Sequence, residues 1–174
     1  MNKYLVLLIL VILSALLIGC WNYRELNSLY IVAGLAVDKA DDAGMFEITV
    51  EAVNMKDTDF QPNIQSYKIE RIGDAIFDSI REMIRISSKH LYWGHATSLI
   101  VSGDVAKDSI MPTLDLIARD PETRMAIDIF ISKEKTAKEL LNTQSFATDI
   151  RSYELNTMVN ESKNLIAVPE KKVY

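Results

Sequence analysis

The chain has 174 residues, in which 24 Asp and Glu outnumber 19 Lys and Arg and give a formal charge of −5. This acidic balance argues against nucleic acid as the main partner, because nucleic-acid-binding proteins normally carry a basic face. It also argues against electrostatic docking on anionic lipid. The single cysteine, Cys20, excludes an intrachain disulfide, which an exported protein can lack.

Residues 1–19 are typical of a secretory signal peptide. Lys3 supplies a positive start, and an apolar run follows from Tyr4 to Leu17 that only Ser14 interrupts. This run is shorter than the ~20 residues that a membrane-spanning helix needs. A retained anchor helix is the alternative, since tilting or bilayer thinning accommodates a short segment.

The stretch Leu17-Ile18-Gly19-Cys20 resembles the lipobox of bacterial lipoproteins. The resemblance implies that the Cys20 sulfur receives a diacylglyceryl group, that the leader is cut before Cys20, and that the new amino group is often acylated, as by palmitate. Residues 20–28 are then the lipidated N-terminal segment. Two acyl chains suffice for stable anchoring, at about 0.8 kcal/mol per buried CH₂. The alternative for Cys20 is a small buried hydrophobic residue.

The first part of the mature chain reads as a β-hairpin. Residues 29–37 (LYIVAGLAV) predict a strand buried on both faces, and residues 40–44 predict a turn. Residues 46–53 (FEITVEAV) alternate apolar and polar side chains, which predicts a half-exposed strand. Residues 54–66 are polar and contain a proline, so we expect a loop, and residues 67–70 (YKIE) fit a short edge strand.

An amphipathic helix follows, with apolar residues at helical spacing: Ile72, Ile76, Ile80, Met83 and Ile84. This apolar stripe favours packing of the helix on the sheet, and binding of a partner is the alternative. Residues 97–101 (TSLIV) predict the next strand, which is approached through Leu91-Tyr92-Trp93-Gly94-His95. A helical turn at 105–107 and a helix over 111–119 come next, with Pro112 tolerable only in the first turn of that helix.

The last third of the chain predicts one more strand, over residues 125–132. Thr136 and Glu139 form a capping box that opens a short helix ending at Leu141. A final helix is expected over about 149–161.

The resulting order, β-β-α-β-α-β-α after the signal peptide, predicts a mixed α/β domain in which helices pack on the sheet. Strands separated by helices need crossover connections, so the later strands should be parallel or mixed. We assign this domain to residues 29–163 and interpret residues 164–174 as the start of a truncated continuation.

The sequence gives little support for catalysis. A nucleophile needs a base within reach, and the imidazoles are limited to His90 and His95, whose spacing of five makes a poor metal pair. Glycine-rich phosphate-binding motifs do not occur. A charged cluster at a helix-to-strand junction either fixes the turn by local ion pairing or contacts a partner: Arg119, Asp120, Glu122 and Arg124.

Four stretches, in order, resemble the Ger(x)C lipoproteins, the C subunits of spore germinant receptors. They are Gly19-Cys20-Trp21-Asn22-Tyr23-Arg24-Glu25-Leu26, Ile31 to Lys39, Leu91 to His95 and Arg119 to Arg124. Asn22 departs from the family, which usually has Asp there. Family members are considerably longer, so the chain resembles their N-terminal domain only.

The resemblance implies a non-enzymatic subunit without a cofactor other than the lipid on Cys20. It implies attachment to the outer face of the inner spore membrane or the cell membrane, beside integral-membrane subunits of the A and B types, and a role in nutrient-triggered germination. A lipoprotein that captures a small nutrient directly is the main alternative. An anchored hydrolase is a further one, with His95 as its base.

Overall fold

The computed structural model of the chain describes residues 2–16, 28–58, 61–108, 110–119, 123, 126–146 and 148–162. The strands in this part of the chain are β1 (Leu29–Lys39), β2 (Phe46–Thr58), β3 (Gln61–Gly73), β4 (His90–Tyr92), β5 (Ser98–Val101) and β6 (Asp128–Ile131). The helices are α1 (Lys3–Leu16), α2 (Ile76–Ser87), α3 (Gly103–Asp108), α4 (Ile110–Arg119), α5 (Ala137–Asn142) and α6 (Arg151–Ser162).

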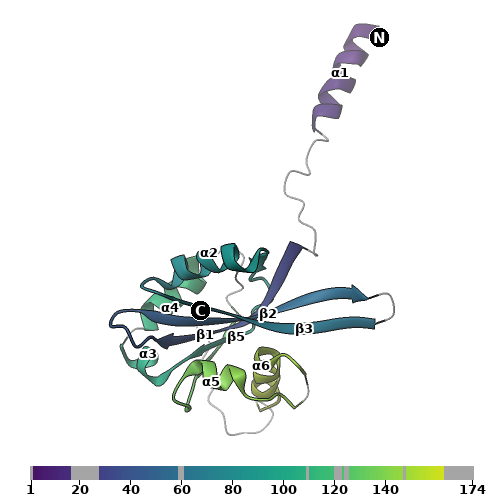
Figure 1. Ribbon diagram of the computed structural model, residues 1–174. Helices are drawn as coiled ribbons and strands as arrows, with labels where there is room; N and C mark the ends of the chain where they lie inside the picture. Colours follow the sequence, from purple (N-terminus) through teal and green to yellow (C-terminus); the bar gives the residue numbers. More distant parts are fainter. Residues whose placement is uncertain are drawn as a thin grey trace.

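The six strands form one mixed sheet in the order β3-β2-β1-β5-β6, with β4 paired to the start of β1. The pairs β1–β2 and β2–β3 are antiparallel, whereas β4 and β5 run parallel to β1, and β6 runs parallel to β5. The expected class is therefore confirmed: a hairpin feeds into crossover units, and helices lie on both sides of the sheet (Figure 1).

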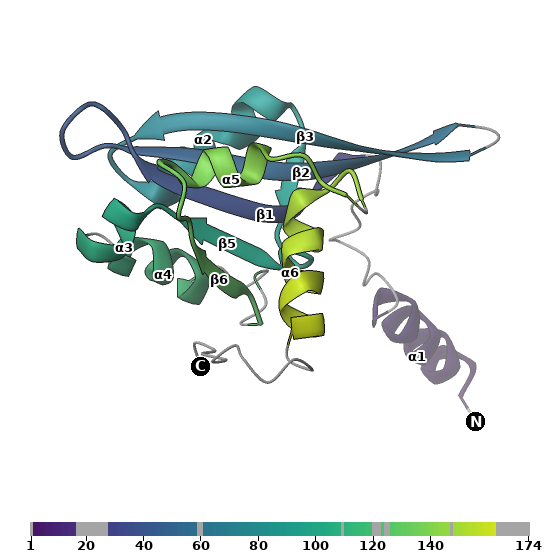
Figure 2. The same cartoon turned by 90° about the horizontal axis from the view of Figure 1, so that it is seen from below.

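Each face of the sheet has its own apolar core. On one face, α2 and α4 pack over the largest core cluster, which includes Val32, Leu35 and Val50 from the sheet. On the other face, α5 and α6 cover two smaller clusters built around Ala36 and Ala33 of β1. Figure 2 shows α5 and α6 side by side on this second face. β1 is consequently buried on both faces, as its apolar sequence predicts.

The N-terminal apolar segment forms α1, whose large side chains are exposed, with Tyr4 at 71% and Leu7 at 67%. Its 14 residues begin after Asn2 and end at Leu16. None of the helices that the structure describes has the length and apolar character to cross a membrane.

The prediction of a loop at residues 54–66 is wrong. β2 continues to Thr58, and β3 begins at Gln61 and pairs with it along 13 residues. Pro62 is compatible with this strand because β3 lies at the edge of the sheet. The same correction removes Ile72 from the predicted helix: it lies in β3, and the helix begins at Ile76.

The expectation that residues 46–53 form a half-exposed strand is also wrong. Thr49 and Glu51 are each only 1% exposed, because α5 and α6 cover the face on which they lie. The alternation of side chains is real, but the polar side chains face a second layer of helices. A charged side chain is stable in such a place only where it finds hydrogen-bond donors.

Gly34 allows α6 to approach the sheet closely. It follows a bulge in β1, at which the register with β2 shifts between Val32 and Gly34. A Cβ atom at Gly34 would lie 2.2 Å from the Ser152 Oγ and 2.8 Å from the Ser98 carbonyl oxygen. The first turn of α6 therefore rests directly on the backbone of β1, where a side chain cannot fit.

We predict that Gly34→Ala lowers the free energy of unfolding by about 1–3 kcal/mol, the usual cost of overpacking a well-packed site. Urea denaturation followed by circular dichroism measures the change. Gly103→Ala is the matched control, because a Cβ there meets nothing within 4 Å. Equal stability of the two variants would contradict the close contact of α6 with β1.

Candidate functional site

The structure describes only part of the predicted site residues. Cys20 lies outside the described residues, as do Asp120, Glu122 and Arg124. Arg119 is described: it ends α4, is exposed, and its Nε donates to Asp115 Oδ1 at 2.7 Å, one helical turn earlier. Exposed pairs of this kind stabilise a helix only slightly. For the four-residue cluster, local ion pairing and the alternative of a partner contact both stay predictions.

The two histidines lie near the start of the sheet. His90 begins β4 and is half-buried, whereas His95 is exposed and its ring packs edge-on against Tyr92, with 5.9 Å between ring centroids. Within the described part of the chain, no group of three His, Cys, Asp or Glu side chains is placed to hold a metal ion.

Glu51 is the most heavily engaged polar side chain of the covered sheet face. It points from β2 at the N-terminus of α6 and accepts from the Ser152 backbone N–H at 2.8 Å, the Ser152 Oγ at 2.6 Å and the Arg151 N–H at 3.1 Å. Ser66 of β3 donates a further bond at 3.0 Å. A carboxylate at this position satisfies N–H groups that the helix cannot, and it complements the positive end of the helix dipole.

Asp38 does the same for α5. At the end of β1, and only 2% exposed, it accepts from the backbone N–H of Ala137 at 2.6 Å and of Lys138 at 2.9 Å. Thr136 completes the N-terminus with the predicted capping box to Glu139, which is confirmed. Burial raises the pKa of the Asp38 carboxyl, and the two backbone hydrogen bonds oppose that rise without cancelling it.

Lysine side chains tie α5 to the outer strands. Lys138 Nζ donates to Glu47 of β2 and to Glu70 of β3, both at 2.7 Å, and these bonds raise its pKa. Lys68 of β3 donates to the Leu141 carbonyl at 2.9 Å, near the end of the helix. Both ends of α5 are thereby fixed to the β2–β3 hairpin.

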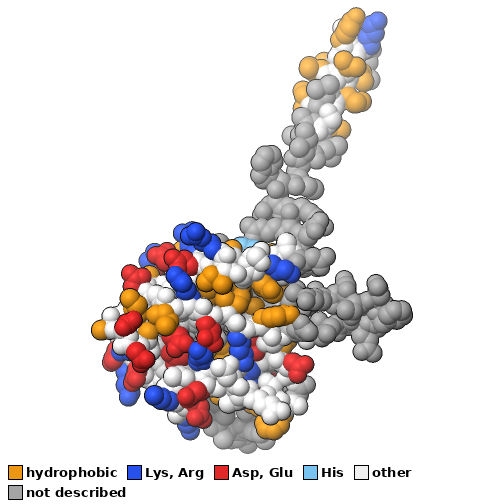
Figure 3. All heavy atoms as spheres, viewed as in Figure 1, with side chains coloured by type: hydrophobic (Ala, Val, Ile, Leu, Met, Phe, Trp, Pro, Cys, Tyr) orange, Lys and Arg blue, Asp and Glu red, His pale blue; other side chains and the backbone are white. Residues whose placement is uncertain are grey.

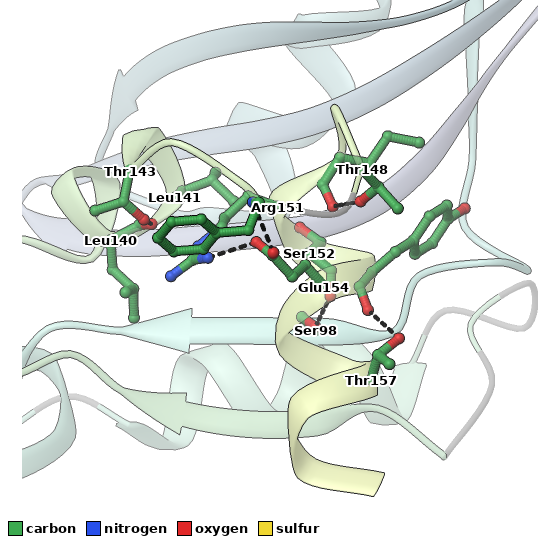
Figure 4. Close-up of polar contacts among 12 residues, drawn as sticks. Ser98, Leu140, Leu141, Thr143, Thr148, Arg151, Ser152, Glu154 and Thr157 are labelled. Carbon is green, nitrogen blue, oxygen red and sulfur yellow. Dashed lines mark hydrogen bonds and ion pairs between the residues drawn. The ribbon is translucent and has the colours of Figure 1, made fainter. Parts of the chain in front are cut away.

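The first turn of α6 carries a second set of polar contacts, which Figure 4 shows. Ser98 Oγ of β5 donates to the Ser152 carbonyl at 2.7 Å. Glu154, 5% exposed, accepts from the Arg151 guanidinium at 2.6 Å and from the Phe146 N–H at 2.8 Å. These buried charges are paired within the domain, so their arrangement is that of a structural network.

An open groove lies at the carboxyl ends of β1 and β5, where ligands often bind in open α/β sheets. Its lining includes Asp38, Ser102, Thr136, Glu47 and Asp104. Asp38 and Glu47 already accept from α5, as described above. The groove is polar, and these two carboxylates serve as acceptors for α5, while Asp41, Asp42 and Asp104 also line it.

Sequence reasoning missed the roles of Glu51 and Asp38. A weak signal existed for Asp38, which directly follows an apolar run where burial is expected, whereas the alternating pattern around Glu51 predicts exposure. Their partners lie about a hundred positions away along the chain, so their hydrogen bonds could not be deduced from local pattern.

Comparison with known proteins defines the class of protein to which this fold and these residues correspond. Residues 22–174 match the family described as the spore germination protein N-terminal domain, and the chain belongs to that family. It shares 27% identity over 138 residues with the putative spore germination protein YfkR of Bacillus subtilis (strain 168), covering 76% of this chain and 36% of that protein.

A second relative is spore germination protein KC of the same organism. It is 23% identical over 167 residues, which cover 90% of this chain and 40% of the relative. The chain thus spans about two fifths of the curated relatives that it matches. No solved structure matched the chain significantly. Family membership supports a role in spore germination.

We predict that Glu51→Gln lowers the free energy of unfolding by about 2–3 kcal/mol, because a charged acceptor is replaced by an amide that meets N–H groups with its own N–H₂. Urea denaturation measures the loss. Glu134→Gln, at an exposed position, is the control and should change stability by less than about 0.5 kcal/mol. Wild-type stability of Glu51→Gln would refute the cap.

We predict that Asp38 makes stability fall as the pH rises. Its folded carboxyl binds a proton more readily than the unfolded one, so its contribution is greatest below the ordinary pKa of 3.8 and declines through the higher folded pKa. The difference in free energy of unfolding between wild type and Asp38→Asn should therefore shrink from acid to neutral pH.

Asp108→Asn supplies a control of opposite sign. The hydrogen bond from Lys39 lowers the pKa of the Asp108 carboxyl, so its contribution is present above the ordinary pKa and is lost as the pH falls. Parallel pH curves for the two differences would contradict the assignment for Asp38.

Proposed function

We propose that the chain is the N-terminal domain of a lipid-anchored, non-catalytic subunit of a spore germinant receptor. In this proposal Cys20 carries the lipid, and the domain acts beside integral-membrane subunits of the A and B types in nutrient-triggered germination. The observation that carries it is the conjunction of the family match over residues 22–174 with a lipobox directly before that region.

The organisation of the domain supports an interaction role over catalysis. Its buried carboxylates cap helices, and the charged side chains of the groove beside Asp38 include members of those same contacts. Catalytic sites need a titratable group that is free to exchange a proton with substrate. The apolar segment before Cys20 supports export of the chain. Acyl chains on Cys20 would then attach it to the outer face of the membrane.

Direct capture of a nutrient is the second candidate, and the groove at the carboxyl ends of β1 and β5 is the feature that favours it. Isothermal titration of the full chain with amino acids and sugars separates the two proposals. Micromolar binding would favour nutrient capture. Loss of that binding after substitution of a residue that lines the groove would assign the nutrient site to the groove.

We predict that Cys20→Ala abolishes palmitate incorporation and leaves the leader attached, because the sulfur that receives the lipid is missing. The test compares spores of the organism that carries the gene, by metabolic labelling, by mass spectrometry of the N-terminus and by the fall in optical density after nutrient addition. The variant should germinate more slowly than the wild type.

Ser14→Ala is the control, since it keeps the leader apolar and leaves Cys20 intact. It should be processed and should germinate as the wild type does. Normal lipid labelling, cleavage and germination of Cys20→Ala would overturn the proposed anchor.

A further inference from the structure

The two ends of the sheet differ in charge. At the carboxyl end of β1, acidic side chains gather around the groove and α3, and outnumber Lys39, Lys107 and Lys135 there: Asp41, Asp42, Glu47, Asp104 and Asp108. Toward the amino end of β1, the chain from Met83 to Thr97 contains no Asp or Glu, although the protein has 24. Figure 3 shows Lys and Arg side chains on either side of a histidine at the top of the domain, and acidic side chains interspersed with Lys and Arg toward the left.

Aromatic, basic and apolar side chains meet at the start of β1. We call the following residues the amino-end surface: Tyr30, Tyr67, Arg85, Ile86, Lys89 and His95. Lys89 reaches the Tyr30 ring because β4 pairs in parallel with the first residues of β1. Arg85 and Ile86 belong to the last turn of α2, just before this strand, and His95 follows it. The surface therefore depends on the tertiary fold.

The contacts within the amino-end surface are close. The rings of Tyr30 and Tyr67 lie 5.8 Å apart, and Lys89 Nζ lies 5.1 Å from the centroid of the Tyr30 ring. Ile86 is 59% exposed, and Arg85 and His95 are exposed too. Tyrosine beside lysine and arginine is the composition that favours the interface between lipid headgroups and water.

The covalent connection to Cys20 restricts how far this surface can lie from the membrane. Nine peptide steps join Cys20 to Leu29, and they reach at most about 32 Å when fully extended. β1 itself is 11 residues long and places its carboxyl end about 33 Å farther on. A lipid on Cys20 therefore keeps the start of β1 within about 32 Å of the anchor, whereas the carboxyl end of the strand can lie about 33 Å farther away.

We propose that the amino-end surface docks on anionic lipid headgroups and orients the domain with its acidic end directed away from the membrane. The inference rests on the proposed attachment at Cys20. Lys and Arg near an anionic bilayer are attracted, and the opposite end of the domain is repelled. The acidic net charge does not oppose this, because the anchor supplies attachment and a high effective concentration, and the surface supplies only orientation.

The test uses a water-soluble amine-reactive ester and measures by mass spectrometry how fast each lysine of the full chain is labelled. The labelling rates are compared between the chain bound to vesicles and the chain free in detergent-free solution. Vesicles contain phosphatidylcholine with a minority of phosphatidylglycerol. The chain is held by its own acyl group or, if processing fails, by coupling Cys20 to a maleimide lipid. Vesicle flotation after expression thus reports on the natural anchor, and lysine labelling reports on orientation.

We predict that Lys89 is labelled several-fold more slowly on the vesicles, whereas Lys39 and Lys135 at the far end keep their rates. Arg85→Glu should reduce the docked population relative to the undocked one by at least about fivefold, the effect of one cation near an anionic surface. Lys133→Glu is the matched control, with the same change of charge at an exposed site on the segment that follows β6, and should leave the labelling of Lys89 unchanged.

Unchanged labelling of Lys89, or equal slowing at Lys39 and Lys135, would overturn the proposed orientation. Slowing that persists on pure phosphatidylcholine and in Arg85→Glu would overturn the role of charge. If Lys89 is shielded only when a membrane-protein partner is added to the vesicles, the surface binds protein and the proposal fails.

Discussion

A carboxylate removed from water must find hydrogen-bond donors, and this requirement organises one whole face of the domain. Glu51 and Asp38 project from neighbouring strands into the layer formed by α5 and α6, and each takes its donors from the N-terminus of a helix. The helices gain acceptors for N–H groups that their own geometry leaves unpaired. Either partner alone would be costly to bury, so the strands and the helices depend on each other.

The same requirement explains why the two sheet faces differ. The face under α2 and α4 is held by apolar packing of Val, Leu, Ile and Met, which is non-directional and tolerates small adjustments. The face under α5 and α6 combines small apolar clusters with hydrogen bonds of fixed geometry, together with the close approach of α6 at Gly34. The positions of α5 and α6 are therefore more tightly specified than burial of apolar surface alone would make them.

Charge is arranged along the sheet as well as across it. The carboxyl end of β1 carries an acidic groove, and the region beside its amino end carries tyrosines and basic residues. Net charge conceals this arrangement, because a chain with an excess of acids can still present a local surface of opposite character. We propose that the domain is tethered just before β1. The unequal distribution of charge can orient such a domain relative to the membrane, which a flexible tether cannot do.

Local pattern determined much of the fold. The apolar run of β1, the stripe of α2 and the capping box at Thr136 each depend on residues close in sequence, and each is confirmed in kind. The polar stretch at 54–66 resisted interpretation because its strand character comes from pairing between β2 and β3, which a polar sequence does not reveal. A sequence window contains the strand but not the partner that stabilises it.

The sequence by itself determined the α/β class, the family resemblance and the candidate lipid site, because periodicity and short motifs are local properties. Only the tertiary structure decided that Glu51 and Asp38 are buried helix caps, since each meets donors about a hundred residues away. It alone also brought Tyr30, Tyr67 and Lys89 onto one surface, through the parallel pairing of β4 with β1 and the hairpin of β2 with β3. Contacts between distant segments follow from chain topology, which no local pattern encodes.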